Sequence, residues 1–251
     1  MPLTTPLNHD ITKAAAGYSQ LSGIMAGFSF AVLVWVVERL NTRDDNLQED
    51  ILVIRALVYL GITFLGNLVD SFFWALLSGV QSLDSPQVGI LAHISAWQMA
   101  QLAPLTMQAM TLVVSTAGSR YAVTLFRRLF FVTALIGAAF TWTHTYAVIQ
   151  RYSASPAMMP YMPVCVALFA ALLLGGFLLS GRPSGQRFGA DTEASFSRFV
   201  SISLVGTLLA GVAFAWATIS PSGIPVSQGA IAIANLLWAA LVAWSCAYLP
   251  D

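Results

Sequence analysis

The residue best suited to chemistry in this sequence is an aspartate inside an apolar stretch. Asp70 lies in ITFLGNLVDSFFWALL, with Asn67 three residues before it and Trp74 four residues after it. Those steps place the three side chains on one face of a helix. A charged side chain deep in a membrane costs about 2.5–3.5 kcal/mol even on the gentlest insertion scale, so an acid at that depth is a functional hypothesis by default. We therefore predict that Asp70 belongs to a functional site.

Two histidines extend this polar pattern to neighbouring stretches. His93, Trp97 and Gln101 follow each other at four-residue steps in the next apolar stretch, and His144 lies in the one after it. At a rise of 1.5 Å per residue, we estimate that Asp70, His93 and His144 lie about 14, 10 and 8 Å below the outer surface of the membrane. We expect an outward-facing polar pocket between helices 2, 3 and 4, formed by Asp70, Asn67, Trp74, His93, Trp97, Gln101 and His144.

The same residue types also have a structural interpretation. Gln, Thr and His side chains bond across helix interfaces in membranes, and each contact stabilises the protein by about 0.6 kcal/mol. Under that interpretation Asp70 is a protonated or hydrogen-bonded structural group. Gly23 and Gly27 form a Gly-x-x-x-Gly ridge, which favours close helix packing within the protein or between copies of it.

The composition predicts that the protein lies in a lipid membrane. Of 251 residues, 57% are apolar and only 9% are Asp, Glu, Lys or Arg, compared with about 25% charged residues in a soluble domain. The 11 basic and 11 acidic residues cancel, so that no cationic surface is left to bind nucleic acid. These numbers exclude a soluble enzyme, a nucleic-acid-binding protein and a disordered chain. The lipid bilayer is the expected partner, in the cell membrane (the inner membrane in a bacterium).

The lengths of the apolar stretches predict the architecture. A bilayer core about 30 Å thick needs about 20 apolar helical residues. We predict an all-α bundle of seven transmembrane helices in one domain, residues 17–250, after a short polar extracytoplasmic segment, residues 1–16. The seven predicted spans are 17–38, 53–79, 86–116, 128–149, 157–180, 199–219 and 228–249.

The basic residues predict the orientation. Nine of the eleven fall on one side of the predicted bundle, and only Lys13 and Arg151 fall on the other. Cytoplasmic connections carry the excess of Lys and Arg, so we expect the N-terminus outside and the C-terminus in the cytoplasm. The nine are Arg39, Arg43, Arg55, Arg120, Arg127, Arg128, Arg182, Arg187 and Arg198.

Seven spans with an outside N-terminus resemble the topology of microbial rhodopsins. Retinal attaches to a lysine of the seventh helix in that family, whereas the only lysine here is Lys13 and the deepest polar group of the last span is Asn235. Retinal is therefore excluded from the last span. Haem b, with His93 and His144 as axial ligands, is an alternative of low rank. We otherwise predict no cofactor and no metal site.

Three kinds of function fit these residues. The first is a channel or carrier for a small solute or ion that uses the polar pocket around Asp70. The second is a membrane-embedded cyclase or isomerase for a lipophilic substrate, in which Asp70 is the general acid and tryptophans stabilise cationic intermediates. The third is a structural or accessory subunit, which needs no site and acts as a homo-oligomer or with a partner protein.

Overall fold

The computed structural model describes residues 11–40, 47–80, 86–116, 120–152, 190–219 and 228–245, with seven further residues between Val164 and Gly175. The regular structure in this part of the chain is entirely helical, as predicted. Its six long helices are α1 (Ile11–Leu40), α2 (Leu47–Ser78), α3 (Pro86–Thr116), α4 (Arg120–Tyr152), α6 (Ala190–Ile219) and α7 (Gln228–Ser245).

Three helical segments are long and apolar enough to cross a membrane, namely Lys13–Arg39, Leu52–Ser78 and Arg120–Thr145. They coincide with the predicted spans 17–38 and 53–79 and with most of 128–149. The predicted span 157–180 falls mostly outside the described residues, as do the predicted segment 1–16 and several of the connections. A membrane-spanning character is therefore supported for three helices.

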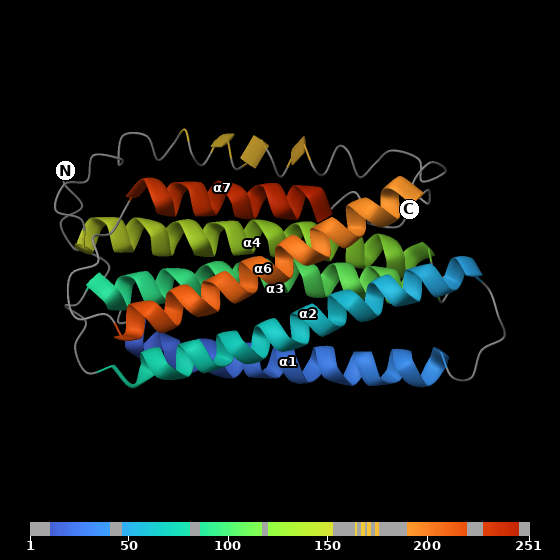
Figure 1. Cartoon of the computed structure of the whole chain (residues 1–251), viewed down its shortest axis with the longest axis horizontal. Coiled ribbons are helices and arrows are strands. Elements are labelled where there is room, and N and C mark those ends of the chain that lie inside the picture. The colour runs from blue at the N-terminus through green and yellow to red at the C-terminus, as the bar shows by residue number, and fades with distance from the viewer. Residues whose placement is uncertain are drawn as a thin grey trace.

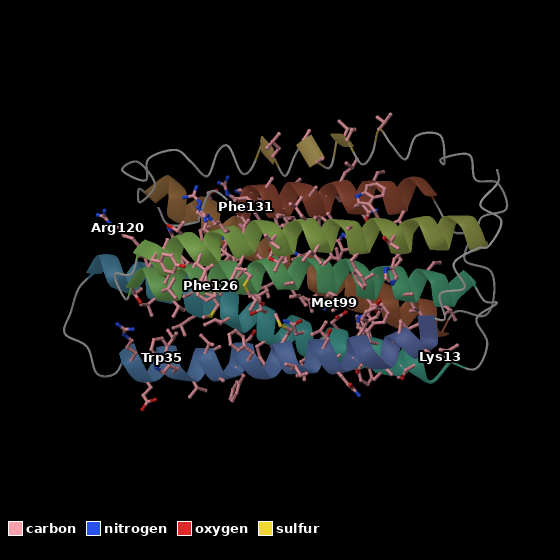
Figure 2. All side chains as sticks on the ribbon, turned by 180° about the vertical axis from the view of Figure 1, so that it is seen from behind. Lys13, Trp35, Met99, Arg120, Phe126 and Phe131 are labelled. Carbon is pink, nitrogen blue, oxygen red and sulfur yellow. The ribbon has the colours of Figure 1, made fainter. Side chains whose placement is uncertain are left out.

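The helices lie side by side along one long axis (Figure 1). Helices α1 to α4 run in alternating directions and pack consecutively, α1 on α2, α2 on α3 and α3 on α4. The ends of α1, α2, α3, α4 and α6 lie toward two opposite ends of the bundle, whereas the shorter α7 does not extend over the whole length. We call the two ends of the bundle the Lys13 end, where α1 begins, and the Arg39 end, where α1 finishes. Figure 2 shows Lys13 at one of these ends, and Trp35 and Arg120 at the other.

Large apolar side chains cover the outside of the bundle, and many polar side chains are buried inside it. Ile24 of α1 and Leu208 of α6 are each 68% exposed. Asp70, Gln98 and Gln108 are completely or almost completely buried. A soluble protein has the reverse distribution, with its charged groups outside. Lipid contacts apolar side chains and leaves polar ones to face other helices, so this surface matches a membrane environment.

Helix α3 is the most enclosed of the described helices. Every described side chain from Val88 to Thr116 is buried or partly buried. Its glutamines and Pro104 lower its mean hydropathy, so that α3 is not among the three candidate spans. A helix that is surrounded by other helices does not contact lipid, so its side chains need not be apolar.

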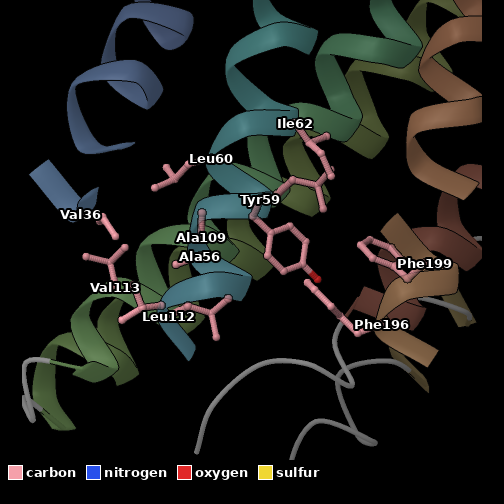
Figure 3. Packing of buried hydrophobic residues seen from close by; sticks show 12 residues of the cluster. Val36, Ala56, Tyr59, Leu60, Ile62, Ala109, Leu112, Val113, Phe196 and Phe199 are labelled. Atoms are coloured by element: carbon pink, nitrogen blue, oxygen red, sulfur yellow. The ribbon is translucent and has the colours of Figure 1, made fainter. Parts of the chain in front are cut away.

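Three apolar clusters hold the helices together. The cluster at the Arg39 end joins α1, α2, α3 and α6 (Figure 3). There the buried Tyr59 of α2 contacts Phe196 and Phe199 of α6, with ring centroids 5.6 and 5.8 Å away. A second cluster surrounds Trp238 and joins α3, α4 and α7. The third surrounds Trp74 near the Lys13 end, beside the candidate site.

Helices α3 and α4 approach closely where Gly137 meets the backbone of Ala100. A Cβ atom at position 137 would lie 2.9 Å from the Ala100 carbonyl oxygen and 3.3 Å from its Cα. We therefore expect Gly137→Ala to push the helices apart and to lower the free energy of unfolding by about 1–3 kcal/mol. Thermal unfolding in detergent measures this loss. Gly27→Ala is the control, because nothing lies within 4 Å of its added Cβ atom, and equal losses would contradict the prediction.

Candidate functional site

Hydroxyl groups connect α1 to α2, mostly in the half of the helix pair that is next to the Lys13 end. Ser19 and Ser71 exchange two hydrogen bonds, in which each hydroxyl donates to the backbone carbonyl of the other residue at 2.8 Å. Nearer the Arg39 end, Thr63 Oγ1 donates to Ser29 Oγ at 3.2 Å. We call these hydroxyl groups, Ser19 and Ser29 of α1 and Thr63 and Ser71 of α2, the polar ladder. Such bonds form inside the helix pair because lipid offers polar groups no partner.

Asp70 lies between the two ends of this ladder and is completely buried. Its Oδ2 accepts a hydrogen bond from Ser22 Oγ of α1 at 2.7 Å. Its Oδ1 has no hydrogen-bond partner in the described part of the chain. The indole N–H of Trp74, one turn further along α2, interacts with the same carboxyl group without reaching hydrogen-bond geometry. The carboxyl group therefore has one hydroxyl donor and one open oxygen atom.

The bonded partner of Asp70 comes from a helix that the predicted pocket does not include. The pocket was expected between helices 2, 3 and 4, whereas Ser22 is on α1. A signal for this was present in the sequence, since Ser19, Ser22 and Ser29 follow each other at steps of three and seven residues. Such steps place all three hydroxyls on one face of a helix.

An aromatic cluster lies between Asp70 and the Lys13 end. The ring of Tyr18 on α1 lies 4.8 Å from Trp74 on α2 and 5.1 Å from Phe140 on α4. The imidazole of His144 stacks on Phe140 with centroids 4.3 Å apart, and its centroid is 6.2 Å from the Trp74 ring. Trp74 therefore contacts both Asp70 and His144. The cluster joins α1 to α4, which are not consecutive in the chain.

His93 belongs to a polar network between α3, α4 and α7. Its Nδ1 lies 3.4 Å from Thr145 Oγ1. That hydroxyl accepts a hydrogen bond from Asn235 Nδ2 at 2.9 Å and donates to the Thr141 carbonyl at 2.9 Å. His93 Nε2 and Asn235 Oδ1 are buried without a hydrogen-bond partner among the described residues. His93 and His144 thus bond to different groups, although their imidazoles are close enough to interact electrostatically.

The remaining residues of the predicted pocket bond to helix backbones or are enclosed. Asn67 Nδ2 donates to the Thr63 carbonyl of its own helix at 2.7 Å. Trp97 Nε1 donates to the Ala234 carbonyl of α7 at 3.1 Å, which fixes α3 to α7. Gln101 is buried within α3. Of these hydrogen bonds, that of Trp97 joins two helices, whereas Asp70 keeps the open oxygen atom.

The two glycines of the Gly-x-x-x-Gly ridge differ in their surroundings. A Cβ atom on Gly23 would lie 3.5 Å from Ser71 Oγ, in ordinary contact with α2. A Cβ atom on Gly27 would have nothing within 4 Å. Of the two glycines, Gly23 is therefore the one that faces α2, the helix that carries Asp70.

A cavity of the described region lies at the opposite end of the bundle from the polar ladder. Its wall is mostly apolar, with Arg39 and Thr116 as its polar members. Trp35, in the same wall, is 13 residues beyond Ser22 on α1, which corresponds to about 20 Å along the helix axis. Among the described residues no group of three or more His, Cys, Asp or Glu could hold a metal ion. The carboxyl group of Asp70 is therefore the centre of the candidate site.

Asp70 and His144 thus both lie beside Trp74 near the Lys13 end, and His93 is close enough to His144 to interact with it electrostatically. Side chains of these types bind cations and exchange protons. No protein-family model, curated protein or solved structure matches the chain, so the site itself is the basis for a functional proposal.

Proposed function

We propose that the chain is a multi-pass protein of the cell membrane with seven transmembrane helices. The three candidate spans and the apolar outer surface support a membrane location. Helix α4 finishes at the Lys13 end, whereas α6 begins at the Arg39 end. The two helix ends that residues 153–189 connect thus lie at opposite ends of the bundle, which supports the predicted span 157–180. A polar α3 can span as well, since the other helices enclose it.

The basic residues support an outside N-terminus and a cytoplasmic C-terminus. The arginines in the halves of the helices next to the Arg39 end are Arg39, Arg55, Arg120, Arg127, Arg128 and Arg198. Lys13 and Arg151 lie in the halves next to the Lys13 end. The positive-inside rule makes the Arg39 end cytoplasmic. Asp70 then lies in the half of the membrane nearer the outside.

Cysteine labelling of intact cells tests this orientation. In a Cys165→Ser, Cys246→Ser background, Lys13→Cys should react with a membrane-impermeant maleimide added outside. Tyr121→Cys should react only after the membrane is permeabilised, because Tyr121 is 82% exposed and follows Arg120, which lies at the Arg39 end. Labelling of Tyr121→Cys in intact cells, with Lys13→Cys protected, would reverse the proposed orientation.

Within this architecture, we infer that the protein is a channel or carrier for a small cation and that Asp70 binds the cation. The observation that carries the inference is the carboxyl group of Asp70, which is completely buried in an apolar helix and has one oxygen atom open among the described residues. Burying such a group is unfavourable, by about 2.5–3.5 kcal/mol on the gentlest scale. An unmade bond of a buried polar group also destabilises the fold, and a cation bound to the open oxygen atom of Asp70 would make that bond.

The polar ladder lies mostly in the half of the helix pair next to the Lys13 end, and this placement favours entry of the cation from that end, past the aromatic cluster. It extends from Ser19 to Ser29 on α1, which corresponds to about 15 Å of helix, about half of a bilayer core. The hydroxyl of Ser22 lies within this length and bonds Asp70. The half of the helix pair next to the Arg39 end is packed with the apolar cluster of Figure 3. This asymmetry favours a binding site that opens to one side over a continuous aqueous pore.

Cation flux through the purified protein in liposomes tests the function. The protein should dissipate a cation gradient, and Asp70→Asn should remove this activity while the protein stays folded.

A further inference from the structure

The groups around Asp70 are suited to a proton and poorly suited to a metal cation. Hard metal cations take several oxygen ligands, typically six or more for Ca²⁺ and Mg²⁺. The two side chains that interact with the carboxyl group present hydrogen-bond donors instead, namely the Ser22 hydroxyl and the Trp74 indole N–H. Oδ1 offers a single open position. A proton needs one lone pair, which this oxygen atom has.

The hydrogen bonds of both histidines leave Nε2 as the nitrogen that can gain a proton. His144 Nδ1 lies 2.9 Å from the Phe140 carbonyl, which can only accept, so Nδ1 carries the hydrogen. Thr145 already donates its proton to the Thr141 carbonyl, so His93 Nδ1 donates to the Thr145 hydroxyl. In their neutral forms both imidazoles therefore present an unprotonated Nε2 inside the bundle.

The side chain of Trp74 lies next to both the carboxyl group of Asp70 and the imidazole of His144. It interacts with the carboxyl group of Asp70 through its N–H and lies 6.2 Å from the His144 imidazole, centroid to centroid. Among the described residues, the titratable groups in this region are Tyr18 from α1, Asp70 from α2, His144 from α4 and, beside His144, His93 from α3. In the described part of the chain, α1, α2, α3 and α4 thus each contribute one group that can exchange a proton.

We propose that the transported cation is a proton, which is exchanged between Asp70 and the pair His144–His93, and that Trp74 is the barrier between them. This inference rests on the proposed function. The proton leaves the carboxyl group of Asp70 and generates a carboxylate, which the Ser22 hydroxyl stabilises. It binds to the lone pair of Nε2 on His144 and generates an imidazolium, whose Nδ1–H stays on the Phe140 carbonyl. No bond other than O–H and N–H changes.

Flux measurements on the full chain in liposomes test the proposal. Internal pH is followed with a dye at a fixed membrane potential, first without and then with Na⁺ or K⁺ gradients, and Na⁺ and K⁺ flux is followed separately. We expect proton flux that is independent of Na⁺ and K⁺ and at least about twofold slower in D₂O. His144→Gln should lower it by about 100-fold, the scale of a lost acid–base group. Trp74→Phe replaces the indole between Asp70 and His144 with a smaller ring that has no N–H, and it should raise the proton flux several-fold. His9→Gln, which changes a histidine before the first predicted span, should leave it unchanged.

The outcomes separate this inference from the function on which it rests. Asp70-dependent Na⁺ or K⁺ flux without proton flux would overturn the proton proposal and leave the transport function standing. Absence of every flux, in protein that keeps its thermal unfolding transition, would overturn both. Proton flux that His144→Gln and Trp74→Phe leave unchanged would overturn the exchange between Asp70 and the histidines.

Discussion

Asp70→Asn should abolish cation flux by the reconstituted protein and leave its thermal unfolding nearly unchanged. Asparagine has the shape of aspartate, and its amide oxygen can accept the hydrogen bond from Ser22 Oγ that Oδ2 now accepts. It has no negative charge and no carboxyl proton, so it can neither hold a cation nor exchange a proton at this position. We expect flux to fall by about 100-fold or more, as for the loss of an acid–base group, with an unfolding midpoint close to that of the wild type.

The controls for this prediction come from the same helix pair. Glu38→Gln removes an acid that is exposed near the Arg39 end of α1, and we expect normal flux from this variant. Ser22→Ala keeps the carboxyl group but removes its hydroxyl donor. It should retain part of the flux and shift its pH dependence. Full flux from Asp70→Asn would show that Asp70 is structural, and the proposed function would then be wrong.

The helices could be predicted from the sequence because apolar length is a strong signal. Each described long helix covers most or all of a predicted span. A hydropathy threshold alone misses α3, whose glutamines and proline lower its average. Its helical period still indicates a helix, and its polarity indicates that it is enclosed. For α3, the helical period is therefore a better guide than mean hydropathy.

The candidate site was only partly predictable from the sequence. Helical spacing predicts that Asn67, Asp70 and Trp74 share a face, but it does not say which neighbouring helix that face meets. Ser22 is a small residue common in membrane helices, so its role follows only from its hydrogen bond to Asp70. Likewise Asn235 contacts the histidine region from α7, which is 90 residues away from Thr145 in the chain. Such pairs depend on the order in which helices pack.

Trp238→Ala should cause the largest loss of stability of any single substitution in α7. Trp238 is completely buried between α3 and α4, in a cluster whose other members include Ala100, Ala134 and Ala138. These alanines cannot fill the space that the indole leaves, because their side chains are single methyl groups. Removing a buried tryptophan costs about 3–5 kcal/mol. We expect the thermal unfolding midpoint in detergent to fall by about 10 °C.

The loss should be specific to the buried face of α7. Leu237 is the preceding residue and is 59% exposed, so Leu237→Ala should change the midpoint by no more than about 1–2 °C, as surface substitutions do. Trp238→Phe should lie between the two, since a phenyl ring fills part of the space. The hydrogen bonds from Trp97 to Ala234 and from Gln108 to Ser245 also fix α7 to α3. They remain possible in all three variants, so the difference between Trp238→Ala and Leu237→Ala measures the packing of the indole between α3 and α4. Equal midpoints for these two variants would mean that α7 does not pack through Trp238.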